Sequence, residues 1–390
     1  MHICIFINKL NVYFVHVIEF GGIIMIKKVV LTGGPCAGKS TAIAKISKVF
    51  TEKGYEVLVV PETATEIINM GIKPFGDNKI YMYDFQKFIL SHQLEKERLI
   101  DEYINLNENK NILVIYDRGI IDNMAYVPLN EFDKLLKEFN ITKSNLFTRY
   151  DSALHLLTAA KGTDFYTTEN NSARSEGKEE AIILDDRILE SYLGFPHLRI
   201  IDNSTNFESK IEKVIKEISN VLGNAYVQKQ YKYLIDFNTI DYKKLERVSR
   251  KFVVKQKYNV KNNEEIMVRK MSFDDEDLYF LRIKSNTNKP SERIIKEKVI
   301  SEKDYDYLHD SFDGNEITKI RYCFSYHDID FRLDIFDDIA LLEVEGEYDN
   351  IIFPDFFRVL EDVTEDEKYR NYNLSKDKRK KLELWNLKCI

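Results

Sequence analysis

The nine residues Gly33–Thr41 constrain this chain more than any other stretch. They read Gly-Gly-Pro-Cys-Ala-Gly-Lys-Ser-Thr and fit the pattern G-x-x-x-x-G-K-[ST], which forms a phosphate-binding loop between a strand and a helix. The β-branched run 26–32 predicts that strand, and the apolar spacing of 42–50 predicts the helix. Glycines allow consecutive N–H groups to face phosphate oxygens, and the helix N-terminus adds partial positive charge. We therefore predict that the loop binds a nucleotide through Gly33, Gly34, Pro35, Cys36, Ala37, Gly38, Lys39, Ser40 and Thr41.

Charged residues follow the next predicted strands of this half. Glu62 comes after the run 56–60, and Asp117-Arg118 comes after 112–116. Ligands of open parallel sheets bind beyond the carboxyl ends of the strands. We expect Lys39 to reach the β- and γ-phosphates, Ser40 and Asp117 to hold Mg²⁺, and Arg118 to contact the transferring phosphate. Glu62 is either a base or ligand on the acceptor side, or a cap of the following helix.

The rest of the first half alternates strands with helices. Strands are expected at 153–157 and 198–201, and helices at 81–105, 179–193 and 207–222, which predicts a parallel, three-layer α/β domain. The segment 161–178 lacks periodicity and contains Arg174. It is either a lid, in which Arg174 neutralises charge on the γ-phosphoryl group, or a surface loop. Asn203, after the last strand, is assigned to the nucleotide-binding set.

Several short motifs of residues 26–222 resemble one family in the right order. They are the glycine loop, Val-Pro-Glu-Thr-Ala, Tyr-Asp-Arg-Gly, His-Leu-Leu-Thr-Ala-Ala, Ala-Arg-Ser-Glu and the segment from Gly194 to Ser204. Together they are similar to the AAA-type, kinase-like ATPase domain shared with the nicotinamide riboside kinase module of the NadR proteins. The resemblance implies a nucleoside-kinase-like P-loop fold. It also implies a catalytic set of Lys39, Glu62, Asp117, Arg118 and the lid residue Arg174.

The second half is dominated by predicted strands, with short helices only at 302–310 and 355–361. The strands are expected at 227–235, 251–259, 265–271, 278–285, 292–299, 317–326, 330–336 and 340–347. They suggest an antiparallel barrel or a strongly curved sheet. Charged residues recur at every second position and therefore share a face, which lies either inside a barrel or in water.

Inside a barrel, these charges would bind phosphate and a divalent cation. The predicted phosphate-binding residues are Lys232, Lys255, Lys257, Arg269, Arg282, Lys284, Arg293, Lys319, Arg321 and Arg332, and the predicted metal-binding acids are Glu343 and Glu345. Motifs such as Phe331-Arg-Leu-Asp-Ile-Phe and Leu342-Glu-Val-Glu resemble the CYTH domain, the triphosphate-tunnel fold. That family has Glu-x-Glu-x-Lys in its first strand, where this chain has Gln228, Gln230 and Lys232. The loss of both acids favours binding over hydrolysis.

The order of the two domains resembles the TRPL translocation defect protein family. This resemblance implies GTP binding, binding of phosphoinositide or phosphatidic acid, and a role in membrane trafficking. We therefore predict a regulatory or membrane-trafficking protein that binds ATP or GTP with Mg²⁺ at the P-loop and a phosphate or phosphoinositide in the barrel. The residues leave a small-molecule kinase and a tunnel triphosphatase as alternative functions. No guanine-reading motif is recognised, so ATP and GTP both stay open.

Bulk composition limits partners and location. A net charge of −7 argues against nucleic acid as a partner, and four scattered cysteines indicate a reducing compartment and no zinc site. We expect a cytoplasmic protein without a stable transmembrane segment, able to associate peripherally with membranes. The domains are predicted at 25–222 and 226–390. Residues 1–24 are either a signal or anchor segment, or an upstream extension before a start near Met25.

Overall fold

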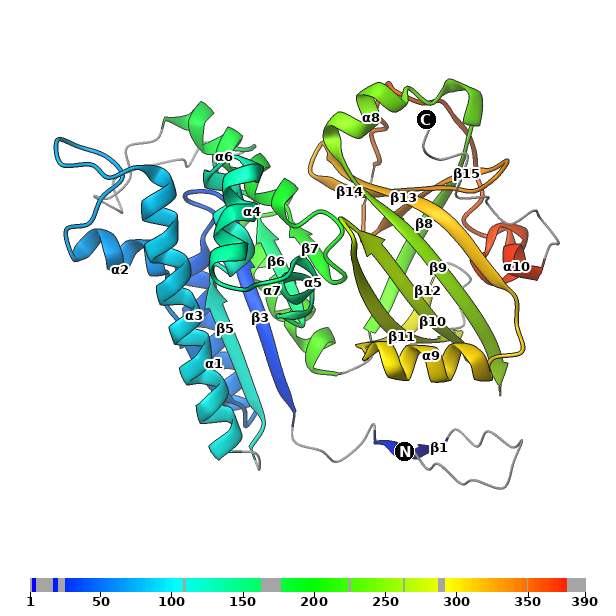
Figure 1. Cartoon of the computed structure of the whole chain (residues 1–390), viewed down its shortest axis with the longest axis horizontal. Coiled ribbons are helices and arrows are strands. Elements are labelled where there is room, and N and C mark those ends of the chain that lie inside the picture. The colour runs from blue at the N-terminus through cyan, green and yellow to red at the C-terminus, as the bar shows by residue number, and fades with distance from the viewer. Residues whose placement is uncertain are drawn as a thin grey trace.

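Five parallel strands form the sheet of the first half (Figure 1). Their order is β4-β5-β3-β6-β7. The bounds are β3 Ile26–Thr32, β4 Glu56–Val60, β5 Ile112–Asp117, β6 Ser152–Leu156 and β7 Leu198–Ile201. This computed structural model describes residues 2–4, 17–19, 25–107, 110–162, 177–223, 226–261, 264–286, 292–348 and 350–376. The spatial order of the strands places β3, and the loop that follows it, at the centre of the sheet.

Helices cover both faces of this sheet. They are α1 Lys39–Glu52, α2 Thr63–Asn69, α3 Met82–Leu106, α4 Leu129–Glu138, α5 Lys143–Thr148, α6 Lys178–Ser191 and α7 Phe207–Leu222, with a 3₁₀ turn, η1, at Ile120–Tyr126. Val30 and Val114 belong to a core with residues of α3, α4 and α6. Val29 and Leu113 belong to the opposite core, with residues of α1 and α7. Alternate strand residues thus supply the two cores, and the three-layer α/β prediction is confirmed.

The second half forms a closed antiparallel barrel. Its strands run in the order β12-β11-β10-β9-β13-β14-β15-β8, and pairing of β12 with β8 closes the ring. The bounds are β8 Tyr226–Ile235, β9 Ser249–Lys261, β10 Glu264–Phe273, β11 Glu276–Asn286, β12 Glu292–Val299, β13 Glu316–Tyr326, β14 Ile329–Ile335 and β15 Ala340–Glu345. A further strand, β16 Val359–Asp362, also pairs with β8. The predicted fold class is therefore confirmed for both halves.

Short helices cover the outside of the barrel. They are α8 Tyr242–Val248, α9 Glu302–Ser311 and α10 Asn371–Lys376, with the 3₁₀ turns η2 Phe237–Thr239 and η3 Glu367–Tyr369. Tyr305 of α9 packs against Val268 and Leu281 of the barrel. On another side, Leu245 of α8 shares a core with Phe324 and Phe331. The outward face is thus apolar wherever helices cover it, so the alternate residues face inward.

The two halves share one continuous core. Phe147 and Phe195 of the α/β domain pack in the same cluster as Phe252 and Phe273 of the barrel, and Phe147 lies 5.1 Å from Phe273 between ring centroids. Figure 1 shows the barrel standing beside the α/β domain at this seam. Burial of aromatic surface on this scale favours a fixed arrangement of the two domains.

One predicted element is wrong, and several were not foreseen. The predicted helix 355–361 is absent, because Phe356 and Phe357 bury their rings in the barrel's outer core and the chain then joins β16. The elements η1, α4 and α5 were not predicted. Residues 2–4 and 17–19 form β1 and β2, a two-stranded antiparallel ribbon. Within the described residues, no helix is long and apolar enough to span a bilayer.

Gly194 provides a test of the seam. Its φ is +82°, and an added Cβ would lie 2.3 Å from the buried ring of Phe252. Gly71 has a similar φ of +95° and open space around it. Gly71→Ala should cost roughly 1–2 kcal/mol, the strain of a left-handed backbone alone. Gly194→Ala should add about 1–3 kcal/mol for the ring displacement. Urea unfolding midpoints measure both, and equal losses would contradict the tight contact.

Candidate functional site

The predicted phosphate loop lies between β3 and α1. Gly33 has a φ of +131°, and an added Cβ would lie 2.0 Å from the Leu156 carbonyl oxygen of the adjacent strand. Gly38 has a φ of +89° and caps α1. Both glycines are required here because other residues rarely adopt this backbone and Gly33 leaves no space for a side chain. The local sequence therefore fixes a loop whose N–H groups end at the helix N-terminus.

Lys39 is buried against this loop. Its Nζ lies 3.1 Å from the Gly33 carbonyl oxygen and 3.3 Å from that of Gly34. Ser40 and Thr41, the next residues of α1, are exposed. The ammonium group and the Ser40 hydroxyl thus lie at the same end of the helix, as the motif predicts for phosphate and Mg²⁺ contacts.

Asp117 ends β5 beside the loop. It pairs in register with Leu31, two positions before Gly33. Its Oδ1 is buried and accepts no hydrogen bond from the described residues. Burial raises the pKa of Asp117, and the nearby Lys39 ammonium opposes this effect. A buried carboxylate oxygen without a donor fits a metal ligand, so Asp117 and Ser40 would hold Mg²⁺ there and bring its positive charge to the phosphates.

Arg118 and Glu62 form an ion pair at the same sheet edge. Arg118 has a φ of +68°, and its Nε donates to Glu62 Oε1 at 2.6 Å. Glu62 Oε2 also accepts from the Thr65 hydroxyl at 2.6 Å. Burial alone would raise the pKa of Glu62, but Arg118 and Lys39 lower it to about 2. The structure thus brings four of the five predicted catalytic residues together, whereas Arg174 lies outside the described residues.

Asp122 belongs to this cluster but was not predicted. Its Oδ1 accepts from Thr32 Oγ1 at 2.6 Å and lies 3.1 Å from Arg118 Nη1. Its Oδ2 accepts from the Tyr192 hydroxyl at 2.7 Å. Asp122 therefore fixes the direction of the Arg118 guanidinium. The only sequence signal was its place four residues after Arg118, in a turn that shows no periodicity.

Asn203 contacts the phosphate loop indirectly, through groups that support it. Its Nδ2 donates to the carbonyl oxygens of Thr158 and Lys161 at 2.8 and 2.7 Å, and its Oδ1 accepts from Lys210 Nζ at 2.8 Å. Lys210 also donates to the Ala37 carbonyl oxygen in the loop, at 3.2 Å, and burial lowers its pKa to about 8. Asn203 thus contacts loop-supporting groups, and its direct contact with nucleotide stays a prediction.

A second unpredicted carboxylate, Asp185 of α6, links the loop to Lys161, which in turn contacts the barrel. Its Oδ1 accepts from the Gly34 N–H at 2.6 Å, and its Oδ2 lies 3.1 Å from Lys161 Nζ. The same ammonium contacts Asp186 and, across the domain seam, Asp328, each at 2.5 Å. These three acids are close enough to hold a metal ion, but the Lys161 ammonium already lies among them.

The barrel interior carries a dense set of charges. Arg321 on β13 reaches Glu343 on β15 at 2.8 Å, past β14, which is possible only on the concave face of the sheet. Among the described residues, the cations on this face include Lys232, Arg269, Arg282, Lys284, Lys319, Arg321 and Arg332. The alternating charges were predicted to lie either inside or in water, and the register places these inside.

Burial strongly shifts the pKa values of several charged groups inside the barrel. Lys319, with 0% exposure, pairs with Asp334 at 2.5 Å, and burial lowers its pKa to about 8. Burial also lowers the pKa of Arg269 to about 10. Burial alone would raise the pKa of Glu297, but Arg269 and Arg282 outweigh it, and the net shift is downward. Glu297 is therefore ionised and acts as a counter-ion of these two arginines.

Two residues that were predicted to line the barrel interior lie on its outer face instead. Lys255 and Lys257 flank Gln256, which pairs in register with Arg269, so both lysines point outward. Lys257 donates to the His309 carbonyl oxygen of α9, outside the barrel, at 2.7 Å. The side chains of Gln228 and Arg293 lie outside the described set, although Arg293 and Gln228 are paired in register on β12 and β8.

The two predicted metal-binding acids of the barrel are engaged with cations. Glu343 contacts Lys232 at 3.0 Å and Arg321 at 2.8 Å, and Glu345 contacts Arg332 at 2.6 Å. A divalent ion would have to displace these partners, so the donor set does not fit Mg²⁺ in this arrangement. Metal binding at Glu343 and Glu345 stays a prediction.

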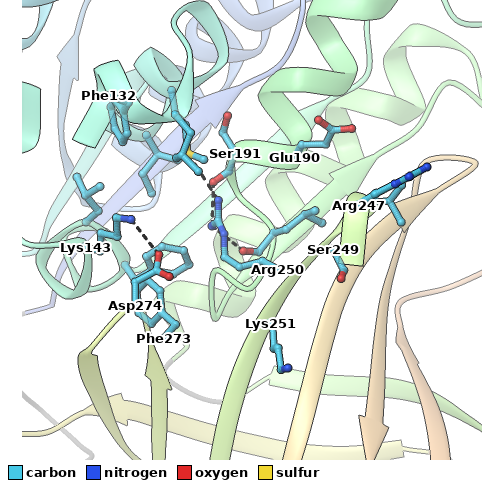
Figure 2. A pocket seen from close by; sticks show the side chains of 17 residues that line it. Phe132, Lys143, Glu190, Ser191, Arg247, Ser249, Arg250, Lys251, Phe273 and Asp274 are labelled. Carbon is cyan, nitrogen blue, oxygen red and sulfur yellow. Dashed lines mark hydrogen bonds and ion pairs between the residues drawn. The ribbon is translucent and has the colours of Figure 1, made fainter. Parts of the chain in front are cut away.

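A cavity of about 480 Å³ lies at the domain seam, away from both charge clusters (Figure 2). Arg250 lies in its centre and donates to the Leu193 carbonyl oxygen at 2.8 Å, and its guanidinium lies 5.2 Å from the Phe147 ring centroid. Lys143 contacts Asp274 at its edge, at 2.9 Å. None of the predicted site residues lines this cavity. Its polar contacts tie the barrel to α5 and α6.

The fold and the loop define a P-loop α/β nucleotide-binding domain joined to a closed antiparallel barrel with a charged interior. Residues 28–210 match a family model described as an AAA domain. No curated protein matches the chain.

Three solved structures are similar to part of the chain. The hypothetical protein NE1496 is 24% identical over 38% of this chain and 97% of its own, with a TM-score of 0.27. A structure titled as the inorganic triphosphatase NE1496 is 23% identical over 38% of this chain and 93% of its own, also at 0.27. The PH1819 protein from Pyrococcus horikoshii OT3 is 18% identical over 32% of this chain and 79% of its own, again at 0.27.

Substitutions in the loop test nucleotide binding. Lys39→Ala should weaken Mg-nucleotide affinity by about 10- to 100-fold, because one charge-assisted contact to phosphate is lost. Asp117→Asn should instead weaken binding only when Mg²⁺ is present. Lys45→Ala, on the exposed side of α1, is the control. Titration calorimetry with ATP and GTP, in Mg²⁺ and in EDTA, measures each effect. Unchanged affinity of Lys39→Ala would contradict the assigned loop.

Proposed function

We propose that this chain binds a purine nucleotide, ATP or GTP, with Mg²⁺ at the P-loop and a phosphorylated ligand inside the barrel. The two sites make it a regulatory protein: the α/β domain responds to nucleotide, and the barrel senses its ligand without cutting it. The P-loop part is supported by the match of residues 28–210 to the AAA domain family and by the cluster around Lys39. The barrel part is supported by the charges of its interior.

Lys284 of β11 is the observation that carries the barrel proposal. It lies on the inner face, because it pairs in register with Glu265 and Ile295, and it is only half-buried. It forms no ion pair with any described residue, and burial lowers its pKa. Glu265 and Glu343 oppose this shift without forming an ion pair with Lys284, and an interior ammonium that lacks an ion-pair partner among the described residues is costly unless something negative binds it. A phosphate group would supply that charge.

The state of the interior acids favours binding over hydrolysis. Glu297, Glu343 and Asp334 each contact at least one arginine. Acids held in this way are poor ligands for the divalent ions that triphosphate hydrolysis needs. Gln230 pairs with Glu345 where the resembled family has an acid. A tunnel triphosphatase is therefore the weakest of the candidate activities.

The resemblance to the TRPL translocation defect protein family suggests a source for the barrel ligand. In that case the phosphate would belong to the headgroup of an anionic phospholipid, such as a phosphoinositide, and the protein would act peripherally in membrane traffic. A soluble triphosphate compound presents the same charge to the barrel. The inner cations fit both sources, so the test must separate them.

Lys284→Gln and Lys255→Gln form a matched pair for this test, one lysine inside the same barrel and one outside. Lys284→Gln should weaken binding of inorganic tripolyphosphate by about tenfold, the value of one charge-assisted contact. Lys255→Gln should bind like the wild type. Calorimetry in EDTA measures both affinities, and phosphate release in Mg²⁺ detects hydrolysis.

Three outcomes would count against parts of the proposal. Equal affinity of the two variants, or no binding by the wild type, contradicts an interior phosphate site. If the Lys39→Ala variant still releases phosphate from tripolyphosphate, the result would favour the triphosphatase. Binding of tripolyphosphate without binding to phosphoinositide-containing vesicles would exclude the lipid source.

A small-molecule kinase is the second candidate, favoured by the Glu62–Arg118 pair beside Lys39 and Asp117. With a pKa of about 2, Glu62 is a weak base that can orient an acceptor hydroxyl throughout the neutral range. Any transfer should therefore show no titration of Glu62 between pH 5 and 8, and Glu62→Gln should lower kcat by roughly 10²–10⁴-fold. Labelled ATP with a panel of nucleosides measures this. Nucleotide binding without phosphorylated product would contradict the kinase.

A further inference from the structure

The seam cavity, the cavity of about 480 Å³ between the two domains, has walls from both of them. Turn η1 and helices α4, α5 and α6 supply residues on one side, and α8, the start of β9 and the end of β10 supply them on the other. Small-molecule pockets are typically about 300–1,000 Å³ and often lie where two domains meet. The size and the place of the seam cavity therefore suit a small organic ligand.

One part of the seam cavity is apolar and aromatic. Phe132, Phe147 and Phe273 line it, and each is almost fully buried. Leu129 and Val248 also line it, but they are 54% and 45% exposed, so they mark the side on which the cavity meets solvent. Contact with this surface removes the apolar body of a ligand from water, and an aromatic body can also pack edge to face against the rings.

Arg250, at the start of β9, places a guanidinium in the seam cavity (Figure 2). Its Nη1 donates to the carbonyl oxygens of Leu193, at 2.8 Å, and Ser191, at 3.3 Å, and its Nη2 donates to Met124 Sδ at 3.6 Å. All three acceptors are neutral. The Nε–H group and one N–H of Nη2 find no acceptor among the described residues. Because a guanidinium has five N–H donors in a planar fork, part of the fork can bind an anion.

The charge of Arg250 is only partly balanced within the described part of the chain. Burial lowers its pKa, and Cys323 and Asp274 oppose this shift without forming an ion pair with it. Asp274 instead contacts the Lys143 ammonium at 2.9 Å. The Phe147 ring, 5.2 Å from the guanidinium, offsets part of the cost of burying the charge. An anion in the seam cavity would supply the direct partner that Arg250 lacks among these residues.

The other charged side chains leave the seam cavity positive. Its cationic residues are Lys143, Arg247, Arg250 and Lys251, and its acidic residues are Glu190 and Asp274. Lys143 and Asp274 neutralise each other. Lys251 has a distant partner, Glu246, at 3.9 Å, which does not line the cavity. The remaining cations therefore outnumber the remaining acid, Glu190, and favour a ligand with one negative group.

We propose that the seam cavity binds a small aromatic carboxylate, with its carboxylate on the Arg250 guanidinium and its ring among Phe132, Phe147 and Phe273. A carboxylate matches the planar fork of arginine, which can donate two parallel hydrogen bonds to it. This site is separate from the P-loop and from the barrel interior, so the inference goes beyond the proposed function. A ligand bound here contacts both domains and fixes one against the other.

The first experiment measures the role of charge. The probes are naphthalene-1-carboxylate and its neutral amide, titrated into the full chain by calorimetry. The wild type should bind the carboxylate about tenfold more tightly than the amide, because only the carboxylate forms charge-assisted hydrogen bonds. Arg250→Gln should bind both probes about equally. Lys255→Gln, which changes an outward-facing lysine of the same strand, should keep the wild-type preference.

The second experiment measures the role of the cavity itself. Val248 and Val260 are both barrel residues with 45% exposure, but only Val248 lines the seam cavity. Val248→Trp should weaken binding of naphthalene-1-carboxylate by about tenfold, because the indole competes for the same space. Val260→Trp should bind like the wild type. Urea unfolding midpoints of all variants report intact folding.

Several outcomes would overturn the proposal. They are no binding of the carboxylate by the wild type, equal affinity of the wild type for the carboxylate and the amide, and an unchanged preference in Arg250→Gln. If Arg250→Gln does not fold, the valine pair decides. A loss of affinity confined to Val248→Trp supports the seam site, and equal affinities of Val248→Trp and Val260→Trp contradict it.

Discussion

Charge balance inside a closed barrel is the constraint on which the second half of this protein depends. Lys319, Arg321, Asp334 and Glu343 are almost fully buried, and any one of them alone would be strongly destabilising. They are tolerated because each contacts an opposite charge on a neighbouring strand or the strand beyond. Such a network fixes the register of the strands, since a shift by one residue would turn every charge outward. Lys284 forms no such ion pair among the described residues, although Glu265 and Glu343 act on its charge, and the proposed phosphate ligand would add a direct partner.

The same constraint explains why the barrel needs its neighbour. The end of the barrel near Phe252 and Phe273 is covered by Phe147 and Phe195 of the α/β domain. Polar contacts surround this apolar contact, among them Glu276 accepting from the N–H groups of α5 at 3.0 and 2.7 Å. Excluding water from one end lowers the effective dielectric inside and strengthens the pairing of the interior charges. The domain seam therefore contributes to the electrostatics of the barrel as well as to its packing.

The sequence predicted those features that depend on neighbouring residues. The strand, glycine loop and helix of 26–50 form one local unit, and the structure has all three. Alternation predicted that Arg282 and Lys284 share a face, but it could not say which face of β9 lies inside. Lys255 and Lys257 were misplaced for that reason, because the answer depends on pairing with β10 and β13. Asp122 and Asp185 were missed since their partners are brought near only by the tertiary fold.

Strand β7 links the two sites more directly than the seam does. It has only four residues, with Arg199 facing the barrel acids and Asn203 two residues past its end. Asn203 holds the Lys161 carbonyl oxygen and accepts from Lys210, which contacts the phosphate loop at Ala37. The Lys161 ammonium in turn contacts Asp328 of the barrel. A barrel ligand that displaced β7 would therefore act on the segment that supports the loop. Any such coupling must be reciprocal, so nucleotide at the loop would shift barrel affinity by the same factor.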